Sequence, residues 1–315
     1  MGNNLIHYFL INFPVINIKV RKVKINVMYK INAKKLILIC FLFFVWFANI
    51  FSREIKVLAI GNSFSEDAVE TYLYDIGIAE GVTFIIGNLV IAGASLETHE
   101  DNAKNNAPVY SYRKIVNGYK TVKKEVTMET AIRDEAWDYI SLQQTSKYAG
   151  MYDTFSPYLT NLINYLKNNA TNSDVQFLWH MTWAYAENST HSGFVNYYDK
   201  NQLRMYDAIL NASDIVETKF KIFRIIPVGT AIQNARTSSL GDSLCRDGFH
   251  LNETYGRFTA ACTWYELLTG NCVVGSSYKP NTISPFEAFI SRMSAHFAVI
   301  FPNKIISLSY CTKED

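Results

Sequence analysis

The chain has 315 residues, of which 49% are hydrophobic, 14% aromatic and 18% charged, and its formal net charge is +2. This composition excludes an intrinsically disordered protein, a collagen-like fibre and a membrane protein with many spanning helices. The length allows one large α/β domain or two small ones.

The first 52 residues differ in charge from the rest of the chain. They hold no acidic residue and seven basic ones, namely Lys19, Arg21, Lys22, Lys24, Lys30, Lys34 and Lys35. Without this segment, 23 of the 30 basic residues remain against 28 acidic ones, so the body carries a net charge of −5. A mildly acidic body argues against nucleic acid as a partner.

A short apolar run follows these basic residues. Lys34 and Lys35 stand directly before residues 36–48, an apolar stretch shorter than the roughly 20 residues of a membrane-spanning helix. This order is typical of a secretory signal peptide. We therefore expect residues 1–52 to be an N-terminal extension and signal peptide, with Met28 as a hypothetical true start. The mature protein would be exported to the periplasm, the cell surface or the medium. An uncleaved anchor is the alternative, and either way this segment would be the only contact with a membrane.

Residues 53–315 alternate between strand-like and helix-like patterns. Short apolar runs predict five strands, at 55–60, 82–91, 137–142, 175–183 and 222–228. Helical patterns lie at 66–80, 157–168, 199–219 and 254–268, the first with Ser65 as its expected N-cap. Such alternation predicts one domain with a parallel sheet that helices cover on both faces. The polar and basic stretch 103–130 is expected to be an excursion over the surface.

Four cysteines follow residue 52: Cys245, Cys262, Cys272 and Cys311. In an oxidising compartment they allow three pairings, among which the sequence does not choose, and free thiols are the alternative. The body contains no C-x-x-C motif and no histidine cluster with metal-ligand spacing, so the sequence predicts no metal site.

Two segments that follow strands carry candidate catalytic residues, because ligands of open parallel sheets bind beyond the carboxyl ends of the strands. The first is Gly61-Asn62-Ser63-Phe64-Ser65, where the glycine permits a sharp bend and Ser63 is either a nucleophile or a helix cap. The second is the segment 246–252. There Asp247 can accept a hydrogen bond from the ring of His250, which leaves the other ring nitrogen for a serine hydroxyl.

Together these features resemble the SGNH (GDSL) hydrolase superfamily over residues 53–268. The shared motifs are a strand followed by Gly-x-Ser, a glycine after the second strand and a late Asp-x-x-His, and the GNSFS and LQQTS stretches look like a secreted bacterial branch. The resemblance implies a flavodoxin-like three-layer α/β/α sandwich with a parallel five-stranded sheet. It also implies a catalytic triad of Ser63, Asp247 and His250. The Ser63 amide, Gly93 and a side-chain amide would form the oxyanion hole, and neither a cofactor nor a metal would be needed.

Two positions depart from the motifs of that superfamily. Asn62 stands where the family has an aspartate, outside the triad. The family's G-x-N-D block is replaced by Gln143-Gln144-Thr145-Ser146. A glutamine amide can donate to an oxyanion as asparagine does, so we expect Gln143, or else Gln144, to be that donor.

Other residues near strand ends have weaker claims to function. Trp183 and Tyr185 are expected, with Asn62, to contact substrate, although packing beneath a loop is the alternative for the two aromatic residues. His180 lies within a strand and is expected in the core. Gly241-Asp242-Ser243-Leu244 spells the family's nickname, but it lacks a strand before it and a helix after it, so a turn accounts for it.

These observations predict an exported serine esterase that removes acyl groups, in particular acetyl groups, from a glycan through an acyl-enzyme. The partner would be an acylated glycan or another small ester. Two alternatives stay open: a lipolytic esterase or thioesterase of the same fold, and a glycan-binding protein without catalytic activity.

Overall fold

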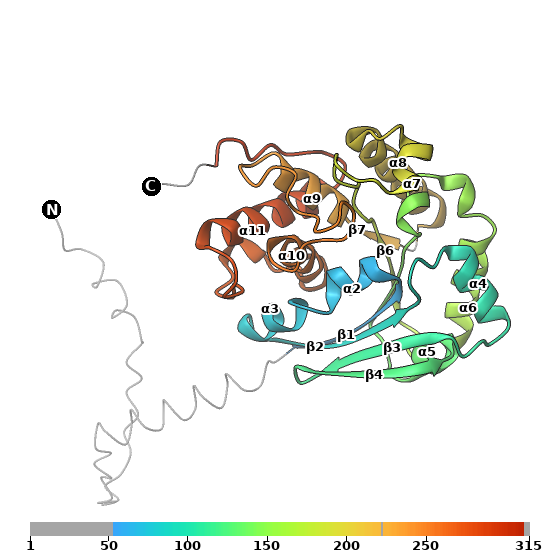
Figure 1. Ribbon diagram of the computed structural model, residues 1–315. Helices are drawn as coiled ribbons and strands as arrows, with labels where there is room; N and C mark the ends of the chain where they lie inside the picture. Colours follow the sequence, from blue (N-terminus) through green and yellow to red (C-terminus); the bar gives the residue numbers. More distant parts are fainter. Residues whose placement is uncertain (1–52, 222, 312–315) are drawn as a thin grey trace, which may run out of the picture. The chain divides into compact units, whose positions relative to one another are not determined.

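The computed structural model describes residues 53–221 and 223–311, and within them seven strands form one sheet of order β4-β3-β2-β1-β5-β6-β7 (Figure 1). The predicted signal segment lies outside the described residues. The strands are β1 (Arg53–Gly61), β2 (Val82–Val90), β3 (Tyr110–Val116), β4 (Tyr119–Val126), β5 (Tyr139–Leu142), β6 (Gln176–His180) and β7 (Phe223–Ile226).

The five strands predicted from the sequence form the parallel part of the sheet. β1 pairs in parallel with β2 and β5, and β5, β6 and β7 follow in parallel pairs. Taken in chain order, these five strands have the spatial order 2-1-3-4-5, as in flavodoxin-like folds. Their carboxyl ends therefore meet at one edge of the sheet.

The prediction of a five-stranded sheet is wrong, because the sheet has seven strands. β3 and β4 form an antiparallel hairpin on β2, within the stretch expected to be a surface excursion. Asn117 and Gly118, which have φ angles of 51° and 77°, form its turn, and Asn-Gly is the pair that two-residue hairpin turns favour. Three of the six basic side chains that suggested an excursion lie on β4, an exposed edge strand.

Helices cover both faces of the sheet, as predicted (Figure 1). One face carries α2 (Ser63–Val69), α3 (Leu73–Ala79), α9 (Val228–Arg236), α10 (Tyr255–Thr269) and α11 (Pro285–Ile300). The other carries α4 (Leu96–Lys104), α5 (Met128–Arg133), α6 (Tyr158–Asn169), α7 (Ser192–Tyr198) and α8 (Gln202–Phe220). Short 3₁₀ turns span Ser146–Tyr148, Tyr152–Thr154 and Val273–Gly275.

The first helix begins three residues earlier than predicted and is interrupted. Asn62, not Ser65, is the N-cap of α2, and its Oδ1 accepts a hydrogen bond from the Phe64 amide at 3.0 Å. Ser65 is buried, and its Oγ lies 2.8 Å from both the Asn62 carbonyl and Asn88 Oδ1. α2 ends at Val69, so the predicted helix 66–80 is two helices. The shift places Ser63 in the first turn of α2, directly after β1.

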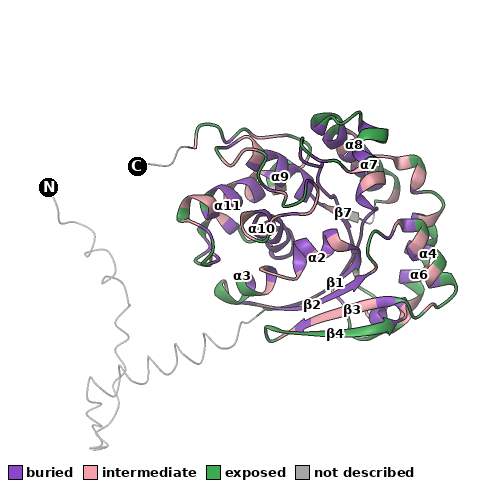
Figure 2. Ribbon diagram, viewed as in Figure 1, coloured by how far each residue is buried: buried purple, intermediate pink, exposed green. Residues whose placement is uncertain are grey.

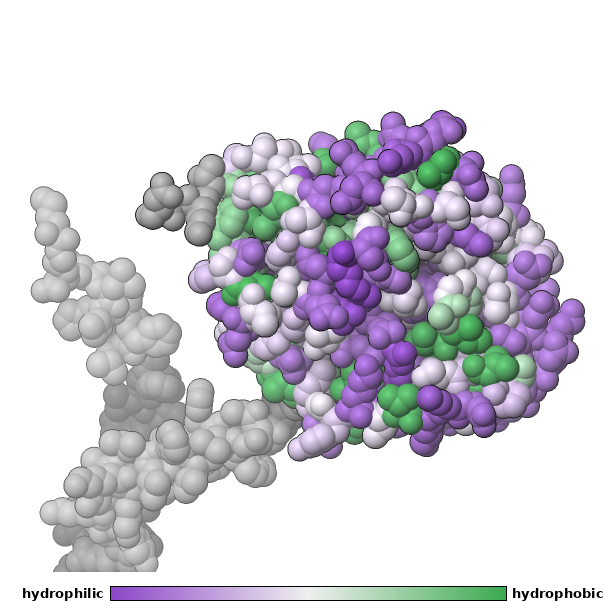
Figure 3. Space-filling view, viewed as in Figure 1, coloured by the Kyte–Doolittle hydropathy of each residue, from purple (hydrophilic) through white to green (hydrophobic). Residues whose placement is uncertain are grey.

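Burial follows the layers of the fold (Figure 2). The central strands β1 and β2 and nearly all of α10 are buried, whereas β4 is exposed along all but its last residue. On the face seen in Figure 3, polar residues predominate and apolar ones form scattered patches. Among the helices of the described ranges, none has both the length and the apolar character needed to span a bilayer.

Candidate active site

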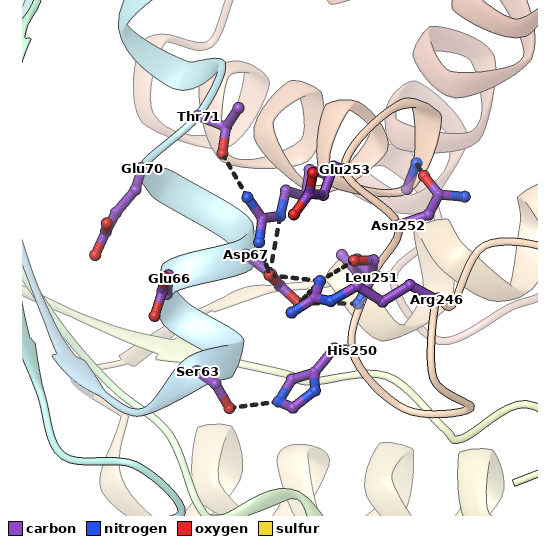
Figure 4. A network of polar contacts seen from close by, with 12 residues as sticks. Ser63, Glu66, Asp67, Glu70, Thr71, Arg246, His250, Leu251, Asn252 and Glu253 are labelled. Atoms are coloured by element: carbon purple, nitrogen blue, oxygen red, sulfur yellow. Dashed lines mark hydrogen bonds and ion pairs between the residues drawn. The ribbon is translucent and has the colours of Figure 1, made fainter.

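Three side chains from two distant segments meet at the carboxyl edge of the sheet. Nε2 of His250 lies 2.8 Å from Oγ of Ser63, and Nδ1 of His250 lies 2.7 Å from Oδ2 of Asp247. Ser63 begins α2, while Asp247 and His250 lie in the loop between α9 and α10. Figure 4 shows the Ser63 hydroxyl facing the His250 ring. The serine, histidine and aspartate therefore form a continuous hydrogen-bonded chain.

The carboxylate of Asp247 is oriented by the backbone of its own turn. Its Oδ1 accepts from the amides of His250 at 2.8 Å and Phe249 at 3.2 Å. Partial burial works against ionisation, but the hydrogen bonds from the His250 ring and from these amides lower the pKa of Asp247. The group thus stays ionised and fixes the proton of the imidazole on Nδ1, which leaves Nε2 as the acceptor that faces Ser63.

A second carboxylate attaches the His250 loop to the helix of Ser63. Asp67, one turn along α2 from Ser63, is 1% exposed and accepts from the Leu251 amide at 2.8 Å (Figure 4). Arg246 and Arg257 pair with its Oδ1 at 3.1 and 2.7 Å. Burial raises the pKa of Asp67, and the two guanidinium groups oppose that rise. Asp67 therefore fixes the distance between the two segments that carry Ser63 and His250.

A cavity of about 450 Å³ opens beside Ser63. Its walls come from the turns after β1, β2 and β5, from the start of α7 and from the His250 loop; the lining residues are Asn62, Ser63, Phe64, Ala92, Gly93, Thr145, Ser146, Lys147, His191, Ser192, Phe249 and His250. A larger cavity of about 540 Å³ lies at the opposite end of the sheet, near the start of β6, and contains none of the candidate residues. The smaller cavity is therefore the candidate site.

Two backbone amides in the wall of this cavity make no hydrogen bond within the described residues. Ser63 is the first residue of α2, and first-turn amides have no partner inside a helix. Gly93 lies in the turn after β2 with a φ of +66°, a conformation that favours glycine, and a Cβ there would meet no atom within 4 Å. Asn62 steadies this turn, because its Nδ2 donates to the Ala94 carbonyl at 3.0 Å. Both amides are thus available to an oxygen atom bound beside Ser63.

Neither glutamine expected as an oxyanion donor reaches the cavity. Gln143 and Gln144 are each 1% exposed, and neither lines the cavity wall. Nε2 of Gln143 donates to Asn62 Oδ1 at 3.0 Å. Nε2 of Gln144 lies 3.1 Å from Thr154 Oγ1, and its Oε1 accepts from the Leu96 amide at 3.0 Å. Gln143 thus contacts Asn62, which lines the cavity, without lining it itself, and Gln144 lies at the N-terminal end of α4.

The hydrogen bonds of Gln143 also fix the protonation of His180. Because Asn62 Oδ1 accepts from a backbone amide, the atom of Gln143 that contacts it is the NH₂ group, and Gln143 Oε1 then faces His180 Nδ1 at 2.9 Å. His180 must therefore carry its proton on Nδ1. Burial lowers the pKa of His180 to about 3, so the ring is neutral, as expected for a core histidine. A Cβ on Gly61 would lie 2.8 Å from the Gln143 side chain, so any larger residue at this position would displace that side chain.

Comparison with known proteins identifies the family. The model of the family described as "Domain of unknown function (DUF4886)" matches residues 56–298. The chain belongs to the DUF4886 family. A DUF4886 family protein from Bacteroides uniformis ATCC 8492, known from a crystal structure, is 50% identical over 81% of this chain and 98% of its own, with a TM-score of 0.79.

Other solved structures are more distant from this DUF4886 chain. A carbohydrate esterase of family 3 from Talaromyces cellulolyticus is 12% identical over 69% of this chain and 97% of its own, with a TM-score of 0.40. A GDSL-like lipase from Bacteroides thetaiotaomicron VPI-5482 is 10% identical over 74% of this chain and 96% of its own, with a TM-score of 0.38. No curated protein matches the sequence.

The expectation that Trp183 and Tyr185 stack on substrate is wrong, because both are 0% exposed. Trp183 stacks on Phe64 with ring centroids 4.3 Å apart and donates its Nε1 to the Phe249 carbonyl at 2.7 Å. It therefore packs beneath the cavity and joins the segment of Ser63 to that of His250. The Tyr185 hydroxyl lies 2.7 Å from Ser146 Oγ. Asn62, the third residue expected to contact substrate, does line the cavity.

Two residues of the cavity wall were not predicted from the sequence of this DUF4886 protein. Lys147 follows the Gln-Gln-Thr-Ser segment, and His191 lies in a stretch of the sequence that suggested no role. The second histidine without an expected role, His99, is buried in α4 with Nδ1 3.0 Å from the Tyr110 hydroxyl. Ser243 of the Gly-Asp-Ser-Leu stretch is exposed and donates to the Leu240 carbonyl, so this stretch is a turn, as predicted.

All four cysteines of the body are unpaired thiols. In the part of the chain that the structure describes, the one group of three potential metal ligands consists of Glu266, Cys272 and His296. His296 Nδ1 lies 2.7 Å from Glu266 Oε1. A hydrogen bond between the histidine and the carboxylate accounts for this distance without a metal ion. None of the three lines the candidate cavity.

Proposed function

We propose that this DUF4886 protein is a serine esterase with Ser63 as nucleophile. The observation that carries the proposal is the chain of contacts from Ser63 Oγ through both nitrogens of His250 to Asp247, at 2.8 and 2.7 Å. A serine hydroxyl is a weak nucleophile until an adjacent base removes its proton, and a base needs a third group to orient it. Here all three groups are in hydrogen-bond contact, and Ser63 and His250 line the same cavity.

The reaction would proceed through an acyl-enzyme. As Ser63 Oγ attacks the carbonyl carbon of the ester, its proton moves to His250 Nε2, and Asp247 stabilises the imidazolium that forms. The imidazolium then returns the proton to the leaving alcohol, and the C–O bond of the ester breaks. Water repeats these steps in the second half: His250 takes a proton from the attacking water, and the acid leaves from Ser63, which regains its proton.

The free amides of Ser63 and Gly93 would bind the oxygen that becomes negatively charged in each tetrahedral intermediate. One such donor contributes about 3 kcal/mol to transition-state stabilisation in comparable sites. Gln143 would act on this site through Asn62, as a positioning residue rather than a donor. Gln144 would have no contact with the intermediate.

The character of the cavity favours a short acyl group on a polar alcohol. Of the twelve residues that line it, the apolar ones are Phe64, Ala92 and Phe249, besides the small Gly93. The hydroxyl groups of Thr145 and Ser192 in this wall would bind the hydroxyl groups of a sugar. Together with the predicted signal segment, this supports acetyl groups on a glycan outside the cytoplasm as the substrate.

An organophosphonate and a series of aryl esters test the proposal. The reagent should label Ser63 alone, and the wild type should hydrolyse 4-nitrophenyl acetate with a higher kcat/KM than the octanoate. Ser63→Ala should lose both properties, with Ser243→Ala as the control. An adduct on Ser243, or full activity in Ser63→Ala, would refute the mechanism. Retention of residues 1–52 in the mature protein from its native cells would refute export with cleavage.

A further inference from the structure

The charge in the wall of the candidate cavity is one-sided. Among its twelve lining residues Lys147 is the one lysine or arginine, and none is an aspartate or glutamate. Within the described residues Lys147 forms no ion pair. Its Nζ lies 4.7 Å from the centre of the Tyr148 ring, which steadies the side chain without neutralising the charge. A lysine without a carboxylate partner beside a cavity is available to an anionic ligand.

The backbone of Lys147 is held in place by α7. Its carbonyl accepts from the Tyr198 hydroxyl at 3.1 Å. A Cβ on Gly193 would lie 2.6 Å from the Lys147 Cβ, so the start of α7 packs directly on this residue. The backbone and Cβ of Lys147 are therefore fixed in the cavity wall, and this limits the positions that its ammonium group can take.

His191, on the same side of the cavity, presents a fixed hydrogen-bond donor. It is the N-cap of α7, and its Nδ1 accepts from the Gly193 amide at 3.0 Å, so the ring proton must be on Nε2. The ring packs between Tyr185 and Phe249, at centroid distances of 4.9 and 5.1 Å. Burial lowers the pKa of His191, as do the Lys147 charge and the neighbouring His250 ring, so the His191 ring stays neutral and keeps this one donor.

We propose that Lys147 and His191 form a subsite for an anionic substituent, carboxylate or sulfate, on the alcohol part of the ester. This inference rests on the proposed function. Because an acetyl group has no charge, the anion must belong to the sugar that carries it, and the preferred substrates are then acyl esters of acidic sugars. Lys147 supplies the charge, and Nε2–H of His191 supplies the directed hydrogen bond.

Acetyl esters that differ in the charge of the alcohol part test the subsite. The probes are 3- and 4-acetoxybenzoate, 4-acetoxybenzenesulfonate and the neutral 4-acetoxybenzamide. The quantity is the ratio of kcat/KM for each anionic ester to that for the amide. Comparing this ratio between variants cancels differences in the chemical reactivity of the probes. A larger ratio for the benzoates than for the sulfonate would indicate a subsite for a carboxylate. A larger ratio for the sulfonate, which stands in for a sulfate, would indicate a subsite for a sulfate.

We expect Lys147→Met to lower the ratio about five- to tenfold, as partly screened charge pairs do. Lys147→Arg should restore most of it, and Lys167→Met, which removes an exposed lysine elsewhere, should leave it as in the wild type. His191→Asn keeps a cap for α7 but removes the ring donor, and should lower the ratio too. In the wild type, 0.5 M NaCl should lower the ratio, whereas in Lys147→Met it should have little effect.

Two failures are distinguishable. If the wild type hydrolyses the neutral and anionic esters but the ratio is the same in Lys147→Met and insensitive to salt, the subsite is refuted and the esterase stands. If the wild type hydrolyses none of the esters and binds no phosphonate at Ser63, the proposed function itself is refuted.

Discussion

Replacing Asp67 by asparagine tests how the two halves of the candidate site are held together. The carboxylate is 1% exposed and accepts from the Leu251 amide and from two arginines. Asp67→Asn keeps the shape of the side chain but removes its charge. It therefore weakens the bonds that join α2 to the His250 loop and leaves two guanidinium groups without their counter-charge.

The expected loss of stability in Asp67→Asn follows from how deeply Asp67 and its two arginine partners are buried. Breaking a buried ion pair by removing one charge costs about 3–5 kcal/mol. The Arg246 and Arg257 side chains are 35% and 15% exposed, so water can partly replace the lost carboxylate. We therefore expect Asp67→Asn to lower the free energy of unfolding by about 3 kcal/mol, the lower end of that range. For a domain of this size this corresponds to a decrease in Tm of roughly 6–12 °C. A shift of the His250 loop by a fraction of an ångström should also lower kcat about tenfold.

Urea unfolding and the hydrolysis of a short-chain ester measure the two effects. Asp199→Asn is the matched control, because the Asp199 side chain is 70% exposed and pairs with Arg204, which is 61% exposed. Such surface pairs contribute less than about 1 kcal/mol. If Asp67→Asn unfolded within 1 kcal/mol of the wild type and kept its full kcat, the idea that Asp67 positions His250 would be untenable.

Three further outcomes are expected. Ser63→Ala should lower turnover by several orders of magnitude, measured with an aryl acetate, whereas the buried Ser65→Ala should mainly lower the free energy of unfolding, by about 1–3 kcal/mol. Burial lowers the pKa of His99 to about 4 and that of His180 to about 3, while both titrate near 6.5 in the unfolded chain, which therefore binds more protons below that pH. Stability should thus be full above pH 6.5 and fall by up to about 4 kcal/mol at pH 5 in urea titrations; a flat profile over this range would contradict it. Gln143→Leu leaves the Nδ1–H of His180 without an acceptor and should lower the free energy of unfolding by about 1–3 kcal/mol. It should lower kcat less than Ser63→Ala does.

The parallel core and the segments of the site follow from the sequence because both depend on strong local patterns. Apolar runs that end in glycine or a turn predict the five parallel strands, and their carboxyl ends must share one edge of the sheet. That topology alone predicts that the segments of Ser63 and His250 come close together. The distances between their side chains, and the bond of Asp67 to the Leu251 amide, depend on long-range packing that no local pattern encodes.

The β3–β4 hairpin was not predicted, because the charged residues of this stretch suggested a surface loop. Its Asn117-Gly118 pair is typical of hairpin turns, and an exposed edge strand accounts for both the turn and the charges. Asn62 and Ser65 are both good helix caps, and the choice depends on where β1 ends. Trp183 and Tyr185 follow a strand end, as substrate-binding residues do, yet both pack against Phe249 of the His250 loop.

The role of Gln143 shows why residue type and position together still do not determine function. A side-chain amide after the third parallel strand suited an oxyanion donor, because the SGNH family has an asparagine there. What decides is the direction of the hydrogen bonds. The Phe64 amide fixes Asn62 Oδ1 as an acceptor, Asn62 then requires the NH₂ group of Gln143, and the remaining oxygen of Gln143 requires a proton on His180. Each step follows from the one before it, so the side-chain NH₂ group of Gln143 faces Asn62 rather than the cavity. In the proposed mechanism the donors to the oxyanion are then the backbone amides of Ser63 and Gly93.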